Sequence, residues 1–289
     1  MEIVKQMKRL GIFLIGLIPL FSVAQDEGQS LLWKVEKEGE APSYVFGTIH
    51  VLPQSDFELD EKIRMALDES EELVLEMDMS DPTLQTRMMQ MAAMSDGQTL
   101  DKLMSEEDYA LLDKKLRKVA VIPLGQVSTY KPFMISTFLL SEYVGSQPAS
   151  FELALMTMAS QREMPISGLE SLELQMAVFD SISYKSQAED LLEMVRDSVE
   201  MRKLFRSMIE EYKAEDMTGL YATTEDYFDS EEEMEYLLYR RNREWVETIN
   251  EKFGEKTYFI AVGAAHLGGD QGLIELLRKD GYRINAIMD

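Results

Sequence analysis

The two histidines of this chain each close a Gly-x-x-His step at the end of an apolar run. The first step is Gly47-Thr48-Ile49-His50 and the second is Gly263-Ala264-Ala265-His266. Ligands bind at the carboxyl ends of parallel strands, so these histidines converge if their strands are neighbours. A lone histidine of this kind is more often a hydrogen-bonded, partly buried side chain. For the pair, the shared Gly-x-x-His spacing after an apolar run favours a divalent-metal site.

A metal site needs further donors, and acidic residues follow two other apolar runs. Glu76 and Asp78 are two apart and share one face of their run, while Glu170 ends another. Acids on apolar strands are costly unless they are paired, hydrogen-bonded or ligating, and a solvated edge or a helix cap is the alternative. A mixed histidine and carboxylate set favours manganese, cobalt or zinc over copper. The candidate metal ligands are His50, His266, Glu76 and Glu170.

Other catalytic motifs are missing from the sequence. There is no Gly-x-Ser-x-Gly elbow and no His-Glu-x-x-His helix, and the glycines from 263 to 272 do not match a phosphate-binding loop. A basic island at 240–243 stands out in an acidic chain. Such a cluster usually balances surface acids, but one of its arginines could bind a substrate carboxylate or stabilise an oxyanion.

The elements that must position these residues can be recognised from periodicity. Residues 31–36 alternate apolar and polar side chains, turn residues follow, and a strand at 43–49 completes a β-hairpin that ends at His50. Helical spacing at 60–70 and a β-type run at 72–78 then open an α/β layer. The chain closes with a second strand, helix and strand at 257–263, 272–279 and 282–287.

Two long segments between these units read as helical. The first, about 81–161, is rich in methionine and is divided by prolines into about four helices, with starts at Asp101 and Ser105. Packing is the favoured explanation for the methionines, with soft-metal binding or a peptide groove as the alternative. After a short strand at 164–170, acid-rich helices occupy about 172–253. The predicted fold is α/β (α+β), a mixed central sheet with an N-terminal β-hairpin and a large helical insertion.

One of the later helices carries the basic island and has an apolar face of its own. Its apolar residues recur at helical spacing, which predicts one buried face. That face is made of Tyr236, Leu237, Trp245 and Ile249.

The N-terminal residues predict export. Three basic residues precede an apolar run over residues 10–23, and Ala24 follows as the cleavage position, which is the pattern of a secretory signal peptide over residues 1–24. The run of about 14 residues is shorter than the ~20 of a membrane helix, which leaves an uncleaved anchor as the minority alternative. We expect cleavage near Ala24, release into the periplasm or the medium, no membrane association afterwards, and one domain over residues 25–289.

Composition restricts the partners and the chemistry. The formal net charge is −24, which argues against binding to nucleic acid or to anionic lipid. Cysteine is absent, so disulfides and thiolate zinc sites are excluded.

Taken in chain order, the motifs resemble those of the TraB/GumN family, whose eukaryotic relatives include the TIKI metalloproteases. One departure is Glu152, where related sequences tend to have aspartate, and its role stays open. The resemblance spans nearly the whole mature chain. It is carried by Phe46–His50, Leu75–Asp78, Gly168–Glu170 with Gln175, Arg241-Asn242, and Val262–Leu267 with Gly269.

The resemblance implies a fold related to the erythromycin-esterase-like and ChaN-like folds and, for the TIKI branch, a divalent-metal peptidase-type site. It carries over His50 and His266 as the motif histidines, Glu76 as the motif acid and Arg241 as the motif arginine. The leading hypothesis is that both histidines and at least one of Glu76 and Glu170 hold manganese, cobalt or zinc beside a water. The other glutamate takes the proton of this water, and Arg241 orients a peptide substrate or stabilises the oxyanion.

Two further functions remain open from the sequence. The first is a non-catalytic protein that captures a peptide or a signalling molecule, which keeps the cleft without needing a metal. The second, from the ChaN resemblance, is a haem- or iron-binding protein.

Overall fold

The computed structural model describes residues 29–145, 147–228 and 230–288. The predicted signal peptide lies outside these ranges. Across them, no helix is both long and apolar enough to cross a membrane.

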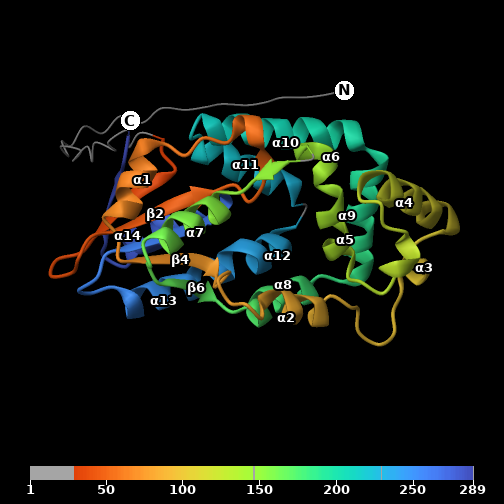
Figure 1. Ribbon diagram of the computed structural model, residues 1–289, viewed down its shortest axis with the longest axis horizontal. Coiled ribbons are helices and arrows are strands. Elements are labelled where there is room, and N and C mark those ends of the chain that lie inside the picture. The colour runs from red at the N-terminus through yellow and green to blue at the C-terminus, as the bar shows by residue number, and fades with distance from the viewer. Residues whose placement is uncertain (1–28, 146, 229, 289) are drawn as a thin grey trace, which may run out of the picture.

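A mixed six-stranded sheet forms the centre of the molecule (Figure 1). Its strands, in chain order, are β1 (Leu32–Glu36), β2 (Ser43–Thr48), β4 (Glu72–Met77), β6 (Ile166–Glu170), β7 (Tyr258–Gly263) and β8 (Arg283–Ala286). In space they follow the order β6-β4-β7-β2-β1-β8. The first four in this spatial order are mutually parallel, and β1 runs antiparallel to both β2 and β8. Four parallel strands therefore end at one edge of the sheet.

A second, much smaller ladder joins two distant parts of the chain. Strand β3 (Leu52–Pro53) lies just after His50, and it pairs antiparallel with β5 (Pro148–Ala149). With two residues on each side, this ladder is too short for a periodic signal in the sequence.

Helices make up most of the rest of the chain. The helices between β3 and β6 are α1 (Glu61–Asp68), α2 (Leu84–Met91), α3 (Leu100–Leu103), α4 (Glu106–Val119), α5 (Pro132–Leu139), α6 (Ser141–Val144) and α7 (Phe151–Gln161). Those that follow β6 are α8 (Leu172–Ser181), α9 (Tyr184–Arg196), α10 (Ser198–Lys213), α11 (Met217–Tyr227), α12 (Glu231–Met234), the π-helical turn η3 (Glu235–Tyr239), α13 (Arg240–Lys252) and α14 (Leu273–Lys279). Short 3-10 turns are η1 (Gln54–Asp56), η2 (Leu124–Gln126) and η4 (Ala264–His266).

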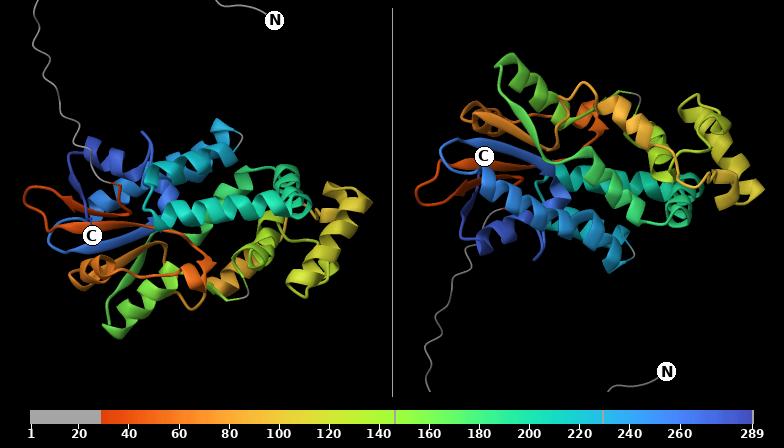
Figure 2. Two further views of the ribbon diagram at one scale, coloured as in Figure 1. Left: turned by 90° about the horizontal axis from the view of Figure 1, so that it is seen from above. Right: turned by 90° about the horizontal axis from the view of Figure 1, so that it is seen from below.

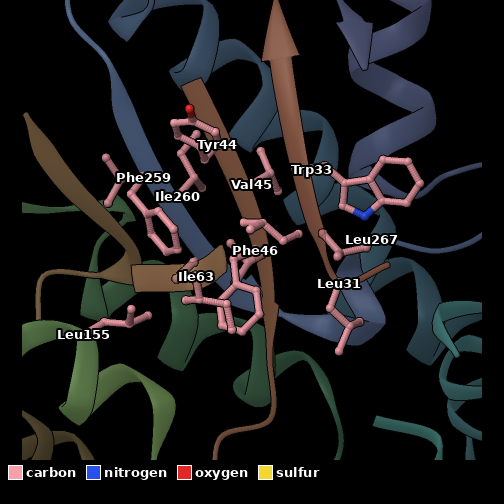
Figure 3. Close-up of a cluster of buried hydrophobic side chains, with 14 of the residues drawn as sticks. Leu31, Trp33, Tyr44, Val45, Phe46, Ile63, Leu155, Phe259, Ile260 and Leu267 are labelled. Atoms are coloured by element: carbon pink, nitrogen blue, oxygen red, sulfur yellow. The ribbon is translucent and has the colours of Figure 1, made fainter. Parts of the chain in front are cut away.

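Helices cover both faces of the sheet (Figure 2). Helices α13 and α14 lie on one face and α1 and α7 on the other. All six residues of β2 and all six of β7 are therefore buried, as expected for strands covered on both sides. The main core is built from these strands and the helices that cover them, and Figure 3 shows Phe46, Phe259 and Leu155 packed within it.

Helices α3, α4, α5, α6 and α9 form a lobe at the far end of the molecule from the β-hairpin (Figure 1). This lobe has its own apolar core, contributed mainly by α4, α5 and α9. Helix α10 runs between the two cores, because Met201 packs in the lobe and Ile209 and Tyr212 pack against the sheet. Helix α10 thereby connects the lobe to the sheet. The assignment of residues 25–289 to one domain stays a prediction.

Most of the elements expected from the sequence are present. The mixed sheet with its N-terminal hairpin confirms the α/β (α+β) class, and the helices and strands at both ends of the chain lie where periodicity placed them. Methionines of the helical segment, among them Met134, Met88 and Met91, pack in a third apolar cluster. That observation favours the packing explanation.

Three local predictions were wrong. The described residues from α2 to α7, these two included, hold six helices rather than about four, because several of the helices are short. Asp101 lies inside α3, whose N-cap residue is Thr99, whereas Ser105 does cap α4. The buried face before α13 was also misplaced, since Leu238 is buried and Leu237 is only partly so. The turn η3 explains the last error, because a π-helical turn inserts a residue and rotates the face.

Candidate functional site

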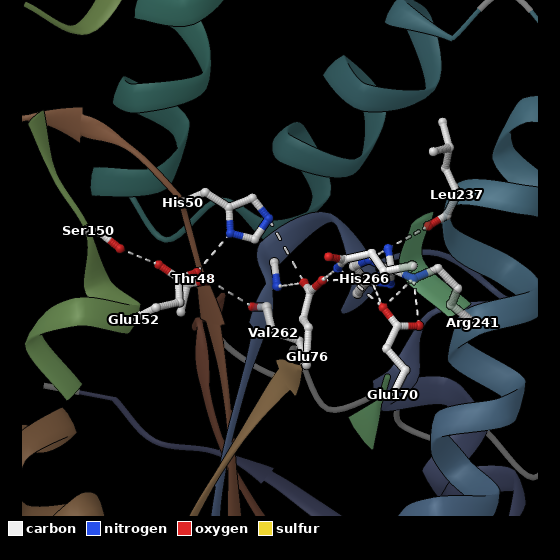
Figure 4. A network of polar contacts seen from close by, with 12 residues as sticks. Thr48, His50, Glu76, Ser150, Glu152, Glu170, Leu237, Arg241, Val262 and His266 are labelled. Carbon is white, nitrogen blue, oxygen red and sulfur yellow. Dashed lines mark hydrogen bonds and ion pairs between the residues drawn. The ribbon is translucent and has the colours of Figure 1, made fainter. Parts of the chain in front are cut away.

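All of the predicted site residues meet at the carboxyl edge of the parallel strands (Figure 4). His50 follows β2, Glu76 and Glu170 lie at the ends of β4 and β6, and His266 follows β7. Arg241 reaches the same edge from α13. The strand order β6-β4-β7-β2 makes the four strands neighbours, which is the condition under which the two histidines were expected to converge.

His50 lies on the open side of the site. Its side chain is 64% exposed. Its Nδ1 donates to Glu152 Oε1 at 2.8 Å, and its Nε2 faces Glu76 Oε1 at 4.0 Å. Desolvation lowers the pKa of His50, but the hydrogen bond to Glu152 and the charges of both glutamates outweigh it and raise the pKa to about 9.

His266 is buried, with 4% of its surface exposed. Its Nε2 accepts a hydrogen bond from Arg241 Nη1 at 3.1 Å, because a guanidinium can only donate. Its Nδ1 therefore carries the proton, which it donates to Asn242 Oδ1 at 2.6 Å. Burial and the nearby Arg241 charge lower the pKa of His266 to about 3, so the ring is neutral.

Arg241 is the centre of the buried half of the site. Its Nη2 donates to Glu76 Oε2 and to Glu170 Oε1, both at 2.6 Å, and its Nε donates to Glu170 at 3.2 Å. Its Nη1 donates to His266 and to the Leu237 carbonyl at 3.0 Å. A guanidinium has five N–H groups, so each of them has a partner within the protein.

The two strand-end glutamates differ in what they face. Glu76 Oε2 binds Arg241 and Gln175, whereas its Oε1 accepts the Gly263 N–H at 2.8 Å and faces His50. Burial raises the pKa of Glu76, but the neighbouring His266, Arg241 and His50 lower it to about 2. Glu76 is therefore an ionised carboxylate with one oxygen directed toward the open side.

Glu170 is directed toward the protein instead. Its side chain is 4% exposed, and both of its oxygens accept from Arg241, with Trp245 Nε1 a further donor at 3.3 Å. Burial raises the pKa of Glu170 in spite of the arginine. Glu170 thus faces Arg241 and Trp245, and its position suits the anchoring of Arg241.

The glycine of each histidine step makes room for the site. A Cβ on Gly263 would lie 3.3 Å from Glu76 Oε1, 3.5 Å from His50 Nε2 and 3.6 Å from His266 Cδ2. A Cβ on Gly47 would lie 2.7 Å from Leu267 Cδ1, in the turn that carries His266. Gly263 thus keeps clear the space on which three site side chains converge, and Gly47 lets the two Gly-x-x-His steps pack together.

The donor atoms of these side chains are of types that bind a divalent cation. Imidazole nitrogens and carboxylate oxygens are ligands for zinc and manganese, and His50 Nε2 and Glu76 Oε1 face one space beside Gly263. The third candidate donor, His266 Nε2, is bound to Arg241. Over residues 29–145, 147–228 and 230–288, no group of three or more such side chains is arranged to hold a metal ion. The donor types therefore fit, with two donors directed at the same space.

Comparison with known proteins bears directly on this site. The sequence model of the TraB/PrgY/gumN family matches residues 31–286, a range that includes the whole sheet and each predicted site residue. The chain belongs to this family. The resemblance inferred from the short motifs is thereby confirmed.

Curated relatives of this TraB/PrgY/gumN chain are named metalloproteases. The chain is 21% identical to metalloprotease TIKI1 of Homo sapiens and 22% identical to that of Danio rerio. These matches cover 90% of the chain, which spans 62% of the human relative and 63% of the fish relative. A metalloprotease TIKI homolog of Amphimedon queenslandica is 35% identical over 72 residues, 22% of the chain and 14% of that protein. No solved structure gives a significant match.

Sequence reasoning gave no role to several residues of this TraB/PrgY/gumN site. Glu152, Asn242 and Trp245 bind the predicted residues. Asn242 and Trp245 share α13 with Arg241, but Glu152 lies on α7, and no spacing pattern connects these three with the glutamate and the histidines that they bind. Glu152 had one usable signal, since a glutamate in the apolar run 151–156 is unusual. An acid in the first turn of a helix is also common as a capping residue, so this signal is not specific for a site.

Proposed function

We propose that this TraB/PrgY/gumN chain is an exported, divalent-metal-dependent hydrolase that cleaves a peptide or protein substrate. The family and the names of its curated relatives support a hydrolase of the protease class. The observation that carries the proposal is the convergence of His50 Nε2, Glu76 Oε1 and His266 on the space beside Gly263.

In this proposal His50 Nε2 and Glu76 Oε1 would hold manganese, cobalt or zinc. His266 would be a further ligand only if its Nε2 gave up the hydrogen bond from Arg241. A bound divalent cation lowers the pKa of a water molecule and polarises a substrate carbonyl. Glu76 suits the role of ligand because its lowered pKa keeps it ionised, which also makes it a weak proton acceptor. Glu76 is therefore assigned to the metal.

Arg241 and Glu170 act as the support of this centre rather than as substrate contacts. Each Arg241 N–H already binds Glu76, Glu170, His266 or Leu237, so an oxyanion would have to displace one of them. Glu170, with both oxygens on Arg241, fixes the guanidinium in turn. Arg241 then holds Glu76 and His266 at their positions beside Gly263.

The test uses the chain from residue 25 onward, purified without a chelator and without a histidine tag. We expect about one manganese, cobalt or zinc ion per chain, and peptide hydrolysis that a chelator abolishes and the metal restores. His50→Ala and His266→Ala should both lose hydrolysis while remaining folded. Gly263→Ala should lose at least about tenfold in activity, because its Cβ fills the reacting space, whereas Gly254→Ala, where a Cβ meets nothing within 4 Å, should not.

Other outcomes would assign other functions. A metal-free chain that binds peptides without cleaving them would be the non-catalytic binding protein. A visible haem spectrum with iron in the sample would indicate the haem- or iron-binding protein. Hydrolysis that survives the chelator but disappears in His50→Ala would refute the catalytic role of a metal. It would leave His50, hydrogen-bonded to Glu152, as the general base.

A further inference from the structure

Glu152 is a buried carboxylate that contacts the site from outside the set of residues predicted from the sequence. It is 8% exposed and lies in the first turn of α7. Its Oε1 accepts from His50 Nδ1 at 2.8 Å and from Thr48 Oγ1 at 2.7 Å, and its Oε2 accepts from Ser150 Oγ at 2.7 Å (Figure 4). Three donors thus fix the orientation of this carboxylate.

Burial of a carboxylate is costly unless hydrogen bonds and charges compensate it. Here the compensation comes from His50 itself and from two hydroxyl groups that flank the two segments, Thr48 at the end of β2 and Ser150 at the start of α7. The Ser150 hydroxyl donates to Glu152. The Thr48 hydroxyl has two acceptors within reach, Glu152 at 2.7 Å and the Val262 carbonyl at 3.3 Å. Two of the three donors that hold the carboxylate are therefore independent of His50.

The small β3–β5 ladder brings the two segments into register. Leu52 pairs with Ala149 and Pro53 with Pro148. The first strand begins two residues after His50, and the second ends three residues before Glu152. The ladder therefore brackets the pair of side chains and explains why a segment from the helical insertion reaches back to the histidine loop.

We propose that Glu152 is the positioning residue of His50: by accepting the Nδ1 proton it leaves Nε2 as the ring atom that faces Glu76 and the space beside Gly263. His266 has the same arrangement, with Asn242 accepting its Nδ1 proton. Both rings thus direct Nε2 inward, each through a dedicated acceptor on a helix. The catalytic consequence of this proposal rests on the proposed function, whereas the ring orientation does not.

The composition of the chain makes a direct test possible. With only two histidines, the imidazole ¹⁵N spectrum of the untagged, metal-free protein contains two rings, which His50→Gln and His266→Gln assign. The spectrum is recorded at a pH above the pKa of His50, so that both rings are neutral. Wild-type His50 should show the proton on Nδ1 and a bare Nε2.

Glu152→Ala should move the proton of His50 toward Nε2, and Glu152→Gln, whose amide oxygen still accepts, should give an intermediate distribution. The His266 ring should stay unchanged in both. The matched control is Glu106→Gln, an exposed glutamate in the first turn of α4, which should leave both rings as in the wild type. In the active enzyme, Glu152→Ala should lower kcat about 10- to 100-fold with a much smaller change in KM.

The proposal is overturned if His50 carries its proton on Nε2 in the wild type, a result that needs no variant to fold. It is equally overturned if folded Glu152→Ala keeps the proton on Nδ1. Should the protein cleave no peptide at all, the proposed function fails while the ring spectra still decide the role of Glu152. A normal kcat in Glu152→Ala with a displaced proton would refute the catalytic consequence alone.

Discussion

The two Gly-x-x-His steps have nearly the same local sequence and opposite surroundings. His50 is exposed, bonds a carboxylate and has a raised pKa, whereas His266 is buried, bonds an amide and an arginine, and has a lowered pKa. Both follow a parallel strand and both rings lie beside Gly263, His50 through its Nε2 and His266 through its Cδ2. The motif thus fixes where an imidazole lies, and the residues behind the ring fix its charge and accessibility.

This difference divides the site into an open half and a buried half. The open half is His50 with one oxygen of Glu76, and it is the half that the proposed function assigns to metal and substrate. The buried half, His266 with Arg241 and Glu170, is a closed network of hydrogen bonds. Substitutions in the buried half should therefore cost much more stability than those in the open half.

The largest expected effect is at Arg241. Arg241→Met leaves two buried carboxylates without their cation, which should cost about 3–5 kcal/mol of unfolding free energy in urea. Arg243→Met is the matched control on the same helix, because Arg243 is half-exposed and bonds Glu235 on the surface. This variant should cost less than about 1 kcal/mol. Equal stabilities for the two variants would contradict the closed network.

The next largest effect is the difference in stability between variants of the two histidines. His266→Ala removes a buried ring, opens a cavity beside Trp245 and leaves the Asn242 oxygen and an Arg241 N–H unpaired, at a cost of about 2–4 kcal/mol. His50→Ala removes an exposed ring and leaves Glu152 with its two hydroxyl donors, so its cost should stay below about 1 kcal/mol. Urea denaturation of both variants measures the two losses of unfolding free energy. Equal losses for His50→Ala and His266→Ala would contradict the division into an open and a buried half.

The sequence was sufficient for the framework of this site because its signals are local. Apolar runs that end in Gly-x-x-His or in an acid mark strand ends, and the parallel arrangement brings Glu76, Glu170 and both histidines to one edge. The strands themselves were found because β2, β4 and β7 are nearly continuous apolar runs, typical of strands buried on both faces.

The partners of these residues could not be predicted, because they depend on contacts between distant segments. Glu152 and His50 are separated by 102 positions, and the ladder that joins them has two residues on each strand. Nothing in the basic island 240–243 shows that Arg241 points inward while Arg243 points out; the π-helical turn before α13 decides the register. The predicted substrate role of Arg241 overlooked that its N–H groups would be occupied.

The smallest effect, measured per pH unit, is the opposite pH dependence of the two histidines. His266 has a folded-state pKa of about 3, below the ordinary 6.5, so the stability it contributes is complete above pH 6.5 and is lost as the pH falls toward 3. The loss should approach about 1.4 kcal/mol per pH unit once the unfolded ring is fully protonated. His50 has a folded-state pKa of about 9, so its contribution is complete below pH 6.5 and is lost as the pH rises toward 9.

Urea denaturation at a series of pH values separates these two limbs. His266→Gln should flatten the acid limb between pH 6.5 and 4.5 relative to the wild type, because the lowered pKa of Glu76 affects stability only below 4.5. His50→Gln should flatten the alkaline limb, by less, since the exposed ring is screened by water. If His266→Gln changed the alkaline limb instead, the assignment of a neutral, buried imidazole to the arginine side of the site would be wrong, and the two steps would not differ in the way that their partners indicate.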